Sequence, residues 1–177
     1  MKLYAKITRV IALAGVTGFS LFAIAQASGL RLNTTKSIPL GLYRTVDDPV
    51  TVGSYVMLCP PNKEPFLEAK RRGYLTTGFC AGGFGYMMKK VLAAKKDVVR
   101  VDPVGVFVNT NLLALSKPLN EDGAGRPMPN VEPPEFSLKE NELLLMSDVS
   151  ATSFDGRYFG PVNKSQIKTV IKPIFLW

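Results

Sequence analysis

The sequence contains no histidine and only two cysteines among its 177 residues. Without histidine, neither a Ser-His-Asp triad nor a Cys-His pair can form, so a hydrolytic serine would need a different base. Two cysteines alone cannot complete the four-ligand shell that zinc prefers, and we expect neither a metal nor another cofactor. The carboxylates also lack the close pairing typical of glycosidases.

Charged side chains are few, at 20% of the chain, whereas apolar side chains make up 46%. This composition is that of one folded domain with its own core, and it is not typical of a disordered chain. The formal net charge is +8. Such a charge suits both a nucleic-acid partner and a surface of anionic lipid, so charge does not choose between them.

The N-terminus has basic residues but no acidic ones before its apolar run. Lys2, Lys6 and Arg9 precede Val10 to Ala27, a run of 18 residues without charge. A positive flank before an apolar run is typical of an export signal or a membrane anchor, because backbone in hydrocarbon must satisfy its own hydrogen bonds as a helix. A buried core helix is the weaker alternative, since no polar stripe interrupts the run.

The end of the apolar run leaves two interpretations open. Ala25-Gln26-Ala27 has the small-x-small form that a leader peptidase accepts, and 18 residues lie near the lower limit for spanning a bilayer. Residues 1–27 are therefore predicted to be a signal peptide or a single membrane anchor. Residues 28–177 are expected to form one domain on the far side of the membrane.

Export affects the interpretation of Cys59 and Cys80. In an oxidising compartment the two can form a disulfide that closes a loop of about 20 residues and stabilises the fold by about 3 kcal/mol. The alternative is a pair of reduced, buried thiols.

The exported part is predicted to be mainly β, with few short helices and an apolar helix before it. Short β-branched runs are separated by Pro, Gly, Asn or Asp. The predicted strands are Ser54 to Leu58, Val98 to Val101, Val104 to Asn109, Leu143 to Met146 and Val170 to Leu176. Pro60 to Arg72 is predicted to hold one short helix, and the proline-rich stretch Leu119 to Pro134 an irregular surface loop.

Lysine is the base that remains once histidine is excluded. An ordinary lysine is protonated at neutral pH, but burial among apolar groups lowers its pKa by disfavouring the charged form. Lys89 lies between Phe84-Gly85-Tyr86-Met87-Met88 and Val91-Leu92-Ala93-Ala94, interrupted only by Lys90. In a strand the two lysines point to opposite faces, so one can be buried while the other is solvated. The alternative is that both are surface lysines.

Three stretches, in this order and spacing, resemble the conserved boxes of the serine/lysine signal peptidases. They are Ser37 to Tyr43 (SIPLGLY), Lys89 to Val91 (KKV) with Asp97-Val98-Val99 downstream, and Ser153 to Val162 (SFDGRYFGPV). The Ser-x-Pro-x-Gly-Leu-Tyr form is most similar to the TraF-type branch that serves conjugative transfer. The resemblance implies a signal-peptidase-like β-sheet catalytic domain over residues 28–177.

The resemblance also implies a role for each matching residue. Ser37 matches the family nucleophile, Lys89 the general base, and Ser153 the hydroxyl that orients the lysine amine. Asp155 and Arg157 match a pair that braces the site. In addition, Thr35 falls where relatives have a serine whose hydroxyl forms the oxyanion hole together with the backbone N–H of Ser37.

The function implied is that of a serine peptidase that processes an exported precursor on the periplasmic side of the bacterial inner membrane. A membrane-bound propilin is the expected substrate, with other conjugative transfer proteins as further partners. Attack by water on the acyl-enzyme gives hydrolysis, whereas attack by an amine of the product gives cyclisation.

Two other classes of function remain. A non-catalytic, envelope-anchored assembly factor of a pilus or secretion apparatus would not need Ser37 or Lys89. A basic DNA-handling protein is disfavoured by the export signal and by the lack of interleaved aromatic and basic residues, so no nucleic-acid partner is expected.

Overall fold

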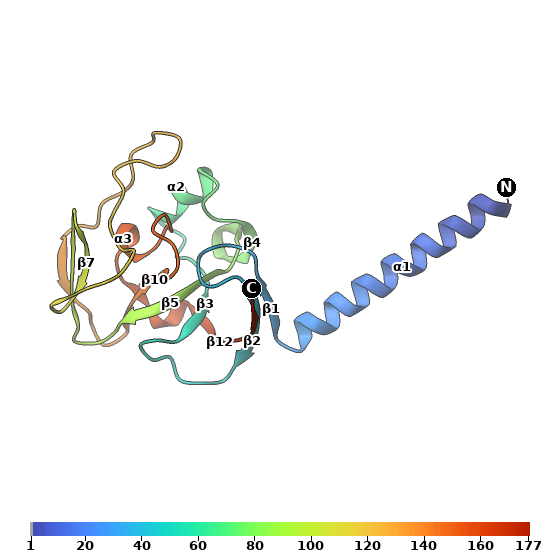
Figure 1. Ribbon diagram of the computed structural model, residues 1–177, viewed down its shortest axis with the longest axis horizontal. Helices are drawn as coiled ribbons and strands as arrows, with labels where there is room; N and C mark the ends of the chain where they lie inside the picture. Colours follow the sequence, from blue (N-terminus) through green and yellow to red (C-terminus); the bar gives the residue numbers. More distant parts are fainter. Residues whose placement is uncertain (1) are drawn as a thin grey trace.

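The computed structural model describes residues 2–177, and its first element is a long helix that projects away from the rest of the chain (Figure 1). This helix, α1, extends over Lys2–Ala27. Its segment Lys6–Ala27 has a mean hydropathy of 1.9, and none of the residues whose burial is described there is buried against protein. By length and composition, α1 is therefore able to cross a membrane.

Seven strands form the main sheet, in the spatial order β1-β2-β12-β3-β5-β10-β11. Their bounds are β1 (Leu30–Asn33), β2 (Gly41–Val46), β12 (Ile167–Leu176), β3 (Tyr55–Leu58), β5 (Met87–Ala93), β10 (Glu142–Met146) and β11 (Val162–Asn163). Every strand pair within residues 2–177 is antiparallel. The β1–β2 hairpin sets Asn33 opposite Gly41, so both ends of the loop that carries Ser37 are fixed on the sheet.

A smaller sheet of four strands has the order β8-β7-β6-β9. Its bounds are β6 (Val98–Asp102), β7 (Gly105–Val108), β8 (Asn111–Leu112) and β9 (Glu135–Ser137). Its buried side chains Val99 and Val106 share one apolar cluster with Leu144 and Met146 of β10. The small sheet is therefore packed against the end of the main sheet that holds β5 and β10.

Short elements complete the fold beside the main sheet. They are α2 (Phe66–Arg71), β4 (Thr77–Cys80), α3 (Gly156–Phe159) and two 3-10 turns, η1 (Ala81–Gly83) and η2 (Lys164–Gln166). The rings of Phe66 and Phe159 lie 4.7 Å apart, which joins α2 to α3 in the main core. Gly156 allows α3 to lie against β10, since a Cβ there would come within 2.7 Å of Leu144 and 3.0 Å of the Leu145 carbonyl.

The prediction of a mainly β domain preceded by an apolar helix is confirmed. Each predicted strand overlaps an observed one, α2 lies within Pro60 to Arg72, and Leu119 to Pro134 contains no strand or helix. Besides the short strands β4, β8, β9 and β11, the strands β1 and β2 were not among those predicted. For β1 the reason is that Leu30–Asn33 is short, and for β2 that Gly and Pro just before Leu42 are more typical of a turn.

Cys59 and Cys80 are joined by a disulfide with a sequence separation of 21. Cys59 directly follows β3, and Cys80 is the last residue of β4. The bond therefore ties β4, which lies outside both sheets, to the centre of the main sheet.

We predict that loss of this disulfide destabilises the domain. A bridge that closes a loop of this length restricts the unfolded chain, and its removal costs about 3 kcal/mol. Denaturant unfolding of the full chain in detergent micelles, followed by circular dichroism, should show a lower midpoint for Cys59→Ser. Dithiothreitol should shift the wild type equally and leave the double variant Cys59→Ser/Cys80→Ser unchanged. An identical midpoint with and without reductant in the wild type would contradict the prediction.

Candidate active site

The loop between β1 and β2 is held by side chains on several sides. Asn33 donates from Nδ2 to the carbonyls of Thr35 (2.7 Å), Ile38 (3.0 Å) and Pro39 (3.0 Å). Tyr43 Oη donates to the same Pro39 carbonyl at 2.7 Å. These bonds satisfy carbonyls that no strand pairs with, and they fix the path of the loop around Ser37.

The hydroxyl of Ser37 lies beside that of Thr35. Their oxygens are 2.9 Å apart, and Thr35 Oγ1 also donates to Asn33 Oδ1 at 3.2 Å. Within residues 2–177 no hydrogen bond joins Ser37 Oγ to Lys89 Nζ. In this structure the Ser37 hydroxyl therefore interacts with Thr35.

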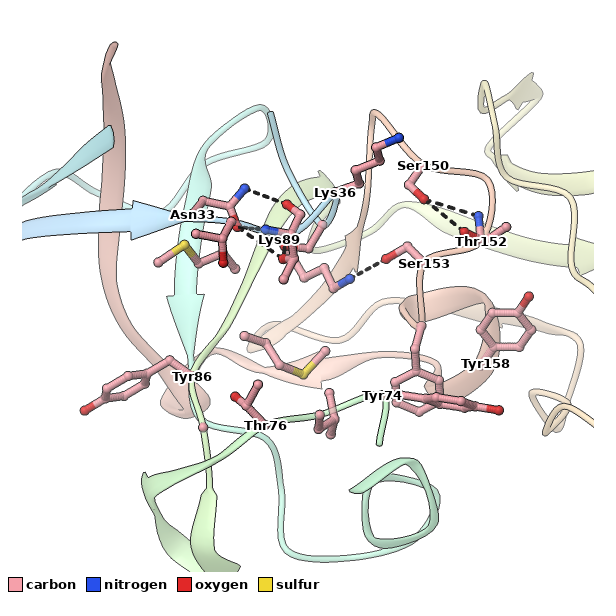
Figure 2. Close-up of a pocket in the computed structure, with 18 of the residues that line it drawn as sticks. Asn33, Lys36, Tyr74, Thr76, Tyr86, Lys89, Ser150, Thr152, Ser153 and Tyr158 are labelled. Carbon is pink, nitrogen blue, oxygen red and sulfur yellow. Dashed lines mark hydrogen bonds between the residues drawn. The ribbon is translucent and has the colours of Figure 1, made fainter. Parts of the chain in front are cut away.

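Lys89 lies on the buried face of β5, where burial alternates along the strand. Only 3% of the residue is exposed, and its neighbour across the sheet is Val56, which is fully buried. Lys89 Nζ donates to Ser153 Oγ at 2.5 Å, as Figure 2 shows. Burial lowers the pKa of Lys89 to about 8. The charge of Asp155 opposes this shift, and that of Arg157 adds to it.

Lys90 is on the opposite face of β5 and partly exposed. Its amine forms an ion pair with Asp148 at 2.9 Å and lies 5.3 Å from the centre of the Tyr55 ring. The alternation confirms that Lys89 is buried while Lys90 is solvated, and the alternative of two surface lysines is wrong.

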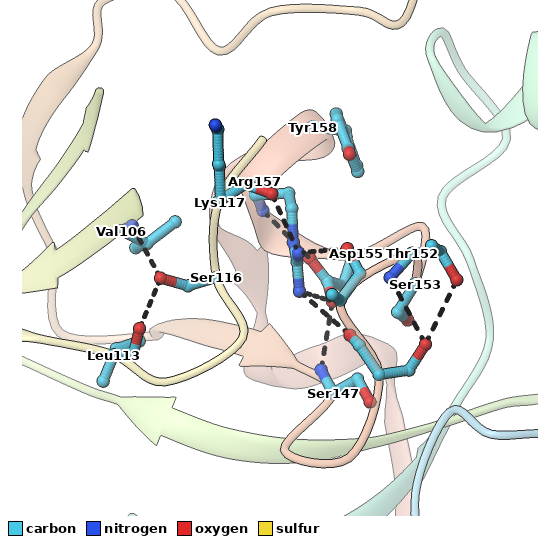
Figure 3. A network of polar contacts seen from close by, with 12 residues as sticks. Val106, Leu113, Ser116, Lys117, Ser147, Thr152, Ser153, Asp155, Arg157 and Tyr158 are labelled. Carbon is cyan, nitrogen blue, oxygen red and sulfur yellow. Dashed lines mark hydrogen bonds and ion pairs between the residues drawn. The ribbon is translucent and has the colours of Figure 1, made fainter. Parts of the chain in front are cut away.

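Asp155 and Arg157 form an ion pair whose side chains are both fully buried, with Nε 2.8 Å from Oδ1 (Figure 3). Asp155 also accepts from the backbone N–H of Ser147 at 3.1 Å, and Arg157 donates to the Ala151 carbonyl at 2.8 Å. The pair therefore links the end of β10 to the loop that carries Ser153.

A cavity of about 770 Å³ connects the candidate residues. Ser37 and Thr35 line it. Lys89 and Ser153 line it as well, as Figure 2 shows. This volume lies within the usual range for ligand sites, about 300 to 1,000 Å³. Chemically, the cavity combines an amine of lowered pKa with hydroxyl groups, which is what a proton transfer from a serine requires.

The structure separates the remaining predicted residues from this cavity. Asp155 and Arg157 are not part of its lining and lie behind Ser153 in the polar network. The disulfide of Cys59 and Cys80 does not border the cavity either. Among residues 2–177 no group of three potential metal ligands is found.

Sequence reasoning missed several residues of the site. Asn33 and Ser147 hold the Ser37 loop, the latter through a 3.2 Å bond to the Lys36 carbonyl. Tyr74 and Met128 also line the cavity. Asn33 could have been found, because an Asn side chain often hydrogen-bonds the backbone of the residue two positions further on, here Thr35. For Tyr74 and Met128 no local signal exists, because only the fold brings them to the cavity.

Comparisons with known proteins extend over the whole chain. A family model described as "Signal peptidase, peptidase S26" matches residues 2–177. Two Escherichia coli proteins named plasmid transfer protein TraF are similar, one 58% identical over 167 residues (94% of each chain) and one 50% identical over 177 residues (100% of each). A conjugal transfer protein TraF from Agrobacterium tumefaciens (strain 15955) is 36% identical over 171 residues, 93% of this chain and 95% of that protein.

One solved structure, a signal peptidase I from Enterococcus faecalis V583, is 13% identical to the chain. It covers 70% of this chain and 97% of its own, with a TM-score of 0.41.

We predict that Arg157→Met strongly destabilises the fold. The change leaves Asp155 as an unpaired buried charge, which costs about 3 to 5 kcal/mol. Denaturant unfolding in micelles measures the loss. The matched control is Arg71→Met. It breaks the two surface ion pairs of an arginine that is 60% exposed, with Glu64 and Glu68, and should change stability by less than about 1 kcal/mol. Equal unfolding free energies for the two variants would contradict the prediction.

Proposed function

The chain belongs to the signal peptidase S26 family, and from this premise we propose that it is a serine peptidase whose nucleophile is Ser37 and whose general base is Lys89. One observation carries the proposal. The amine of Lys89 is buried, has a lowered pKa and lines the same cavity as Ser37. In a chain without histidine, this amine is the base that the geometry offers to a serine.

The lowered pKa makes proton transfer possible near neutral pH. With a pKa of about 8, roughly one Lys89 amine in ten is neutral at pH 7, compared with fewer than one in a thousand at the ordinary value. The neutral amine takes the proton of Ser37 as its oxygen attacks a peptide carbonyl, and it later returns the proton to the leaving amine. For this step the Ser37 hydroxyl turns from Thr35 towards Lys89, while Ser153 orients the amine.

The oxyanion of the intermediate would be held by the backbone N–H of Ser37 and the hydroxyl of Thr35. The Ser37 N–H has no acceptor among residues 2–177, so it is free to donate. One donor directed at the developing charge contributes about 3 to 4 kcal/mol to the transition state. Asp155 and Arg157 keep Ser153 in position from behind.

We place the peptidase domain, residues 28–177, on the periplasmic side of the inner membrane, with residues 1–27 as a signal peptide or anchor. The support is helix α1, which is apolar and not covered by protein. The similar proteins are named for plasmid and conjugal transfer. The substrate proposed is therefore an exported, membrane-bound precursor of a conjugative apparatus, with a propilin as the specific candidate and other transfer proteins as partners.

The fate of the acyl-enzyme decides which product is made. Water gives a hydrolysed pilin. An amine of the pilin itself, held near the acyl group, gives a cyclic product, because a positioned group reacts at a high effective concentration.

A second candidate function is a non-catalytic, membrane-anchored assembly factor. It is favoured by the interaction of Ser37 with Thr35 and not with Lys89. In that case neither side chain would be needed for maturation of the pilin.

The dyad predicts that Ser37→Ala and Lys89→Met each abolish processing of purified propilin by the full chain in micelles. The loss should exceed about 10³-fold, since nucleophile and base act as a unit. Lys90→Met is the matched control and should retain activity, because its amine lies on the other face of β5. Mass spectrometry of the product separates hydrolysis from cyclisation, which leaves one water less. Full processing by Ser37→Ala would instead support the assembly factor.

The pKa of Lys89 predicts the pH dependence of the reaction. Because only the neutral amine accepts the proton, kcat/KM should fall as the pH drops below about 8 and level off above it. Measurements of kcat/KM between about pH 6 and pH 10 provide the test, with circular dichroism at each pH as the control for folding. A flat profile across this range would exclude Lys89 as the base.

A further inference from the structure

We propose that Asn33 is a positioning residue that sets both the path of the Ser37 loop and the direction in which the Thr35 hydroxyl points. This inference rests on the proposed roles of Ser37 and Thr35. Asn33 is the last residue of β1 and is only 4% exposed, so it does not contact solvent in the way that most asparagines do.

The amide nitrogen of Asn33 organises the loop. It is the donor for three carbonyls within five residues of chain, those of Thr35, Ile38 and Pro39, at 2.7, 3.0 and 3.0 Å. A side-chain amide has two N–H groups, so one of them is shared between two acceptors. The carbonyls on both sides of Ser37 therefore converge on one side chain.

The amide oxygen of Asn33 acts on Thr35. It accepts from the Thr35 backbone N–H at 3.3 Å and from the Thr35 hydroxyl at 3.2 Å. The opposite assignment of the amide would direct its oxygen at three carbonyls and its nitrogen at the Thr35 backbone N–H, and only the contact with the Thr35 hydroxyl could remain a hydrogen bond. The network thus fixes the orientation of the amide.

The orientation of the Asn33 amide affects the hydrogen bond between the hydroxyls of Thr35 and Ser37. The hydroxyl of Thr35 has one proton, and the Asn33 oxygen can accept it. In the 2.9 Å contact between Thr35 and Ser37 either hydroxyl can donate, and Ser37 is the donor whenever the Thr35 proton points to the Asn33 oxygen. Asn33 therefore holds Thr35 next to the proposed nucleophile through two contacts. When the Thr35 hydroxyl proton leaves the Asn33 oxygen for an arriving oxyanion, the bond from the Thr35 backbone N–H to that oxygen still keeps Thr35 in place.

Other side chains that hydrogen-bond the loop carbonyls do not also contact the Thr35 hydroxyl. Tyr43 donates to the Pro39 carbonyl, and Ser147 to the Lys36 carbonyl. Neither is bonded to the hydroxyl of Thr35. Tyr43→Phe is therefore the matched control, because it removes a partly buried hydrogen bond from the same loop and leaves the Asn33-Thr35 contact in place.

The test is a double-mutant cycle with Asn33→Ala and Thr35→Val, measured as kcat and KM on propilin with full chain in micelles. Removal of one oxyanion donor lowers kcat by about 10²-fold, and we expect this for each single variant with KM within about threefold. Because Asn33 acts partly through Thr35 and partly through the loop carbonyls, the double variant should lose more than about 10²-fold but clearly less than about 10⁴-fold. Tyr43→Phe should stay within about threefold of the wild type.

Asn33→Asp covers the case in which the alanine variant does not fold. A buried carboxyl group is neutral at low pH, keeps one donor and one acceptor, and can replace the amide in part, whereas a carboxylate has no donor. Its kcat should decline at alkaline pH, where that of the wild type is maximal, while circular dichroism is unchanged. A wild-type profile for Asn33→Asp would overturn the inference.

The remaining outcomes separate the two proposals. Suppose that Ser37→Ala is inactive. In that case, losses in kcat that multiply in the double variant would overturn the role of Asn33 and leave the proposed function intact. A kcat for Asn33→Ala equal to that of Tyr43→Phe would do the same. Activity in Ser37→Ala would overturn the proposed function, and the role of Asn33 with it.

Discussion

The burial of one amine is the constraint on which the site depends. Lys89 occupies a core position of β5, with Val91 and Ala93 following on the same face, and such a position is normally apolar. A charge there loses its hydration, so the fold shifts the amine towards its neutral form and compensates with a single hydroxyl, that of Ser153. The main sheet supports this arrangement, since Lys89 is only 3% exposed and lies opposite the fully buried Val56 of β3.

Polar side chains give the surrounding loops the rigidity that a sheet gives to strands. The loop before Gly41 has carbonyls that no strand satisfies, and Asn33 takes over three of them. The loop after β10 is fixed in the same way by the ion pair of Asp155 and Arg157. Each loop thus presents its hydroxyl, of Ser37 or Ser153, from a backbone that is tied down on both sides.

Sequence patterns predicted the parts of the fold that depend on local order. The apolar run yields α1, and alternation in β5 separates Lys89 from Lys90 because strand geometry requires it. What could not be predicted depends on distant pairing. Tyr74 and Met128 line the cavity because two loops, distant in sequence, bring them there. The role of Asn33 depends on the loop turning the carbonyls of Ile38 and Pro39 back towards its side chain.

The short connection between α1 and the sheet limits how far Ser37 can lie from the membrane. Helix α1 ends at Ala27, β1 begins at Leu30, and Ser37 follows ten residues after Ala27. Ten residues span at most about 36 Å even when fully extended, and the turn into β2 shortens this reach. With α1 in a bilayer, the hydroxyl of Ser37 cannot rise far above the lipid headgroups. If Ser37 acts as proposed, a precursor would have to present its cleavage point at a similarly shallow depth, and bonds farther from the membrane would escape cutting.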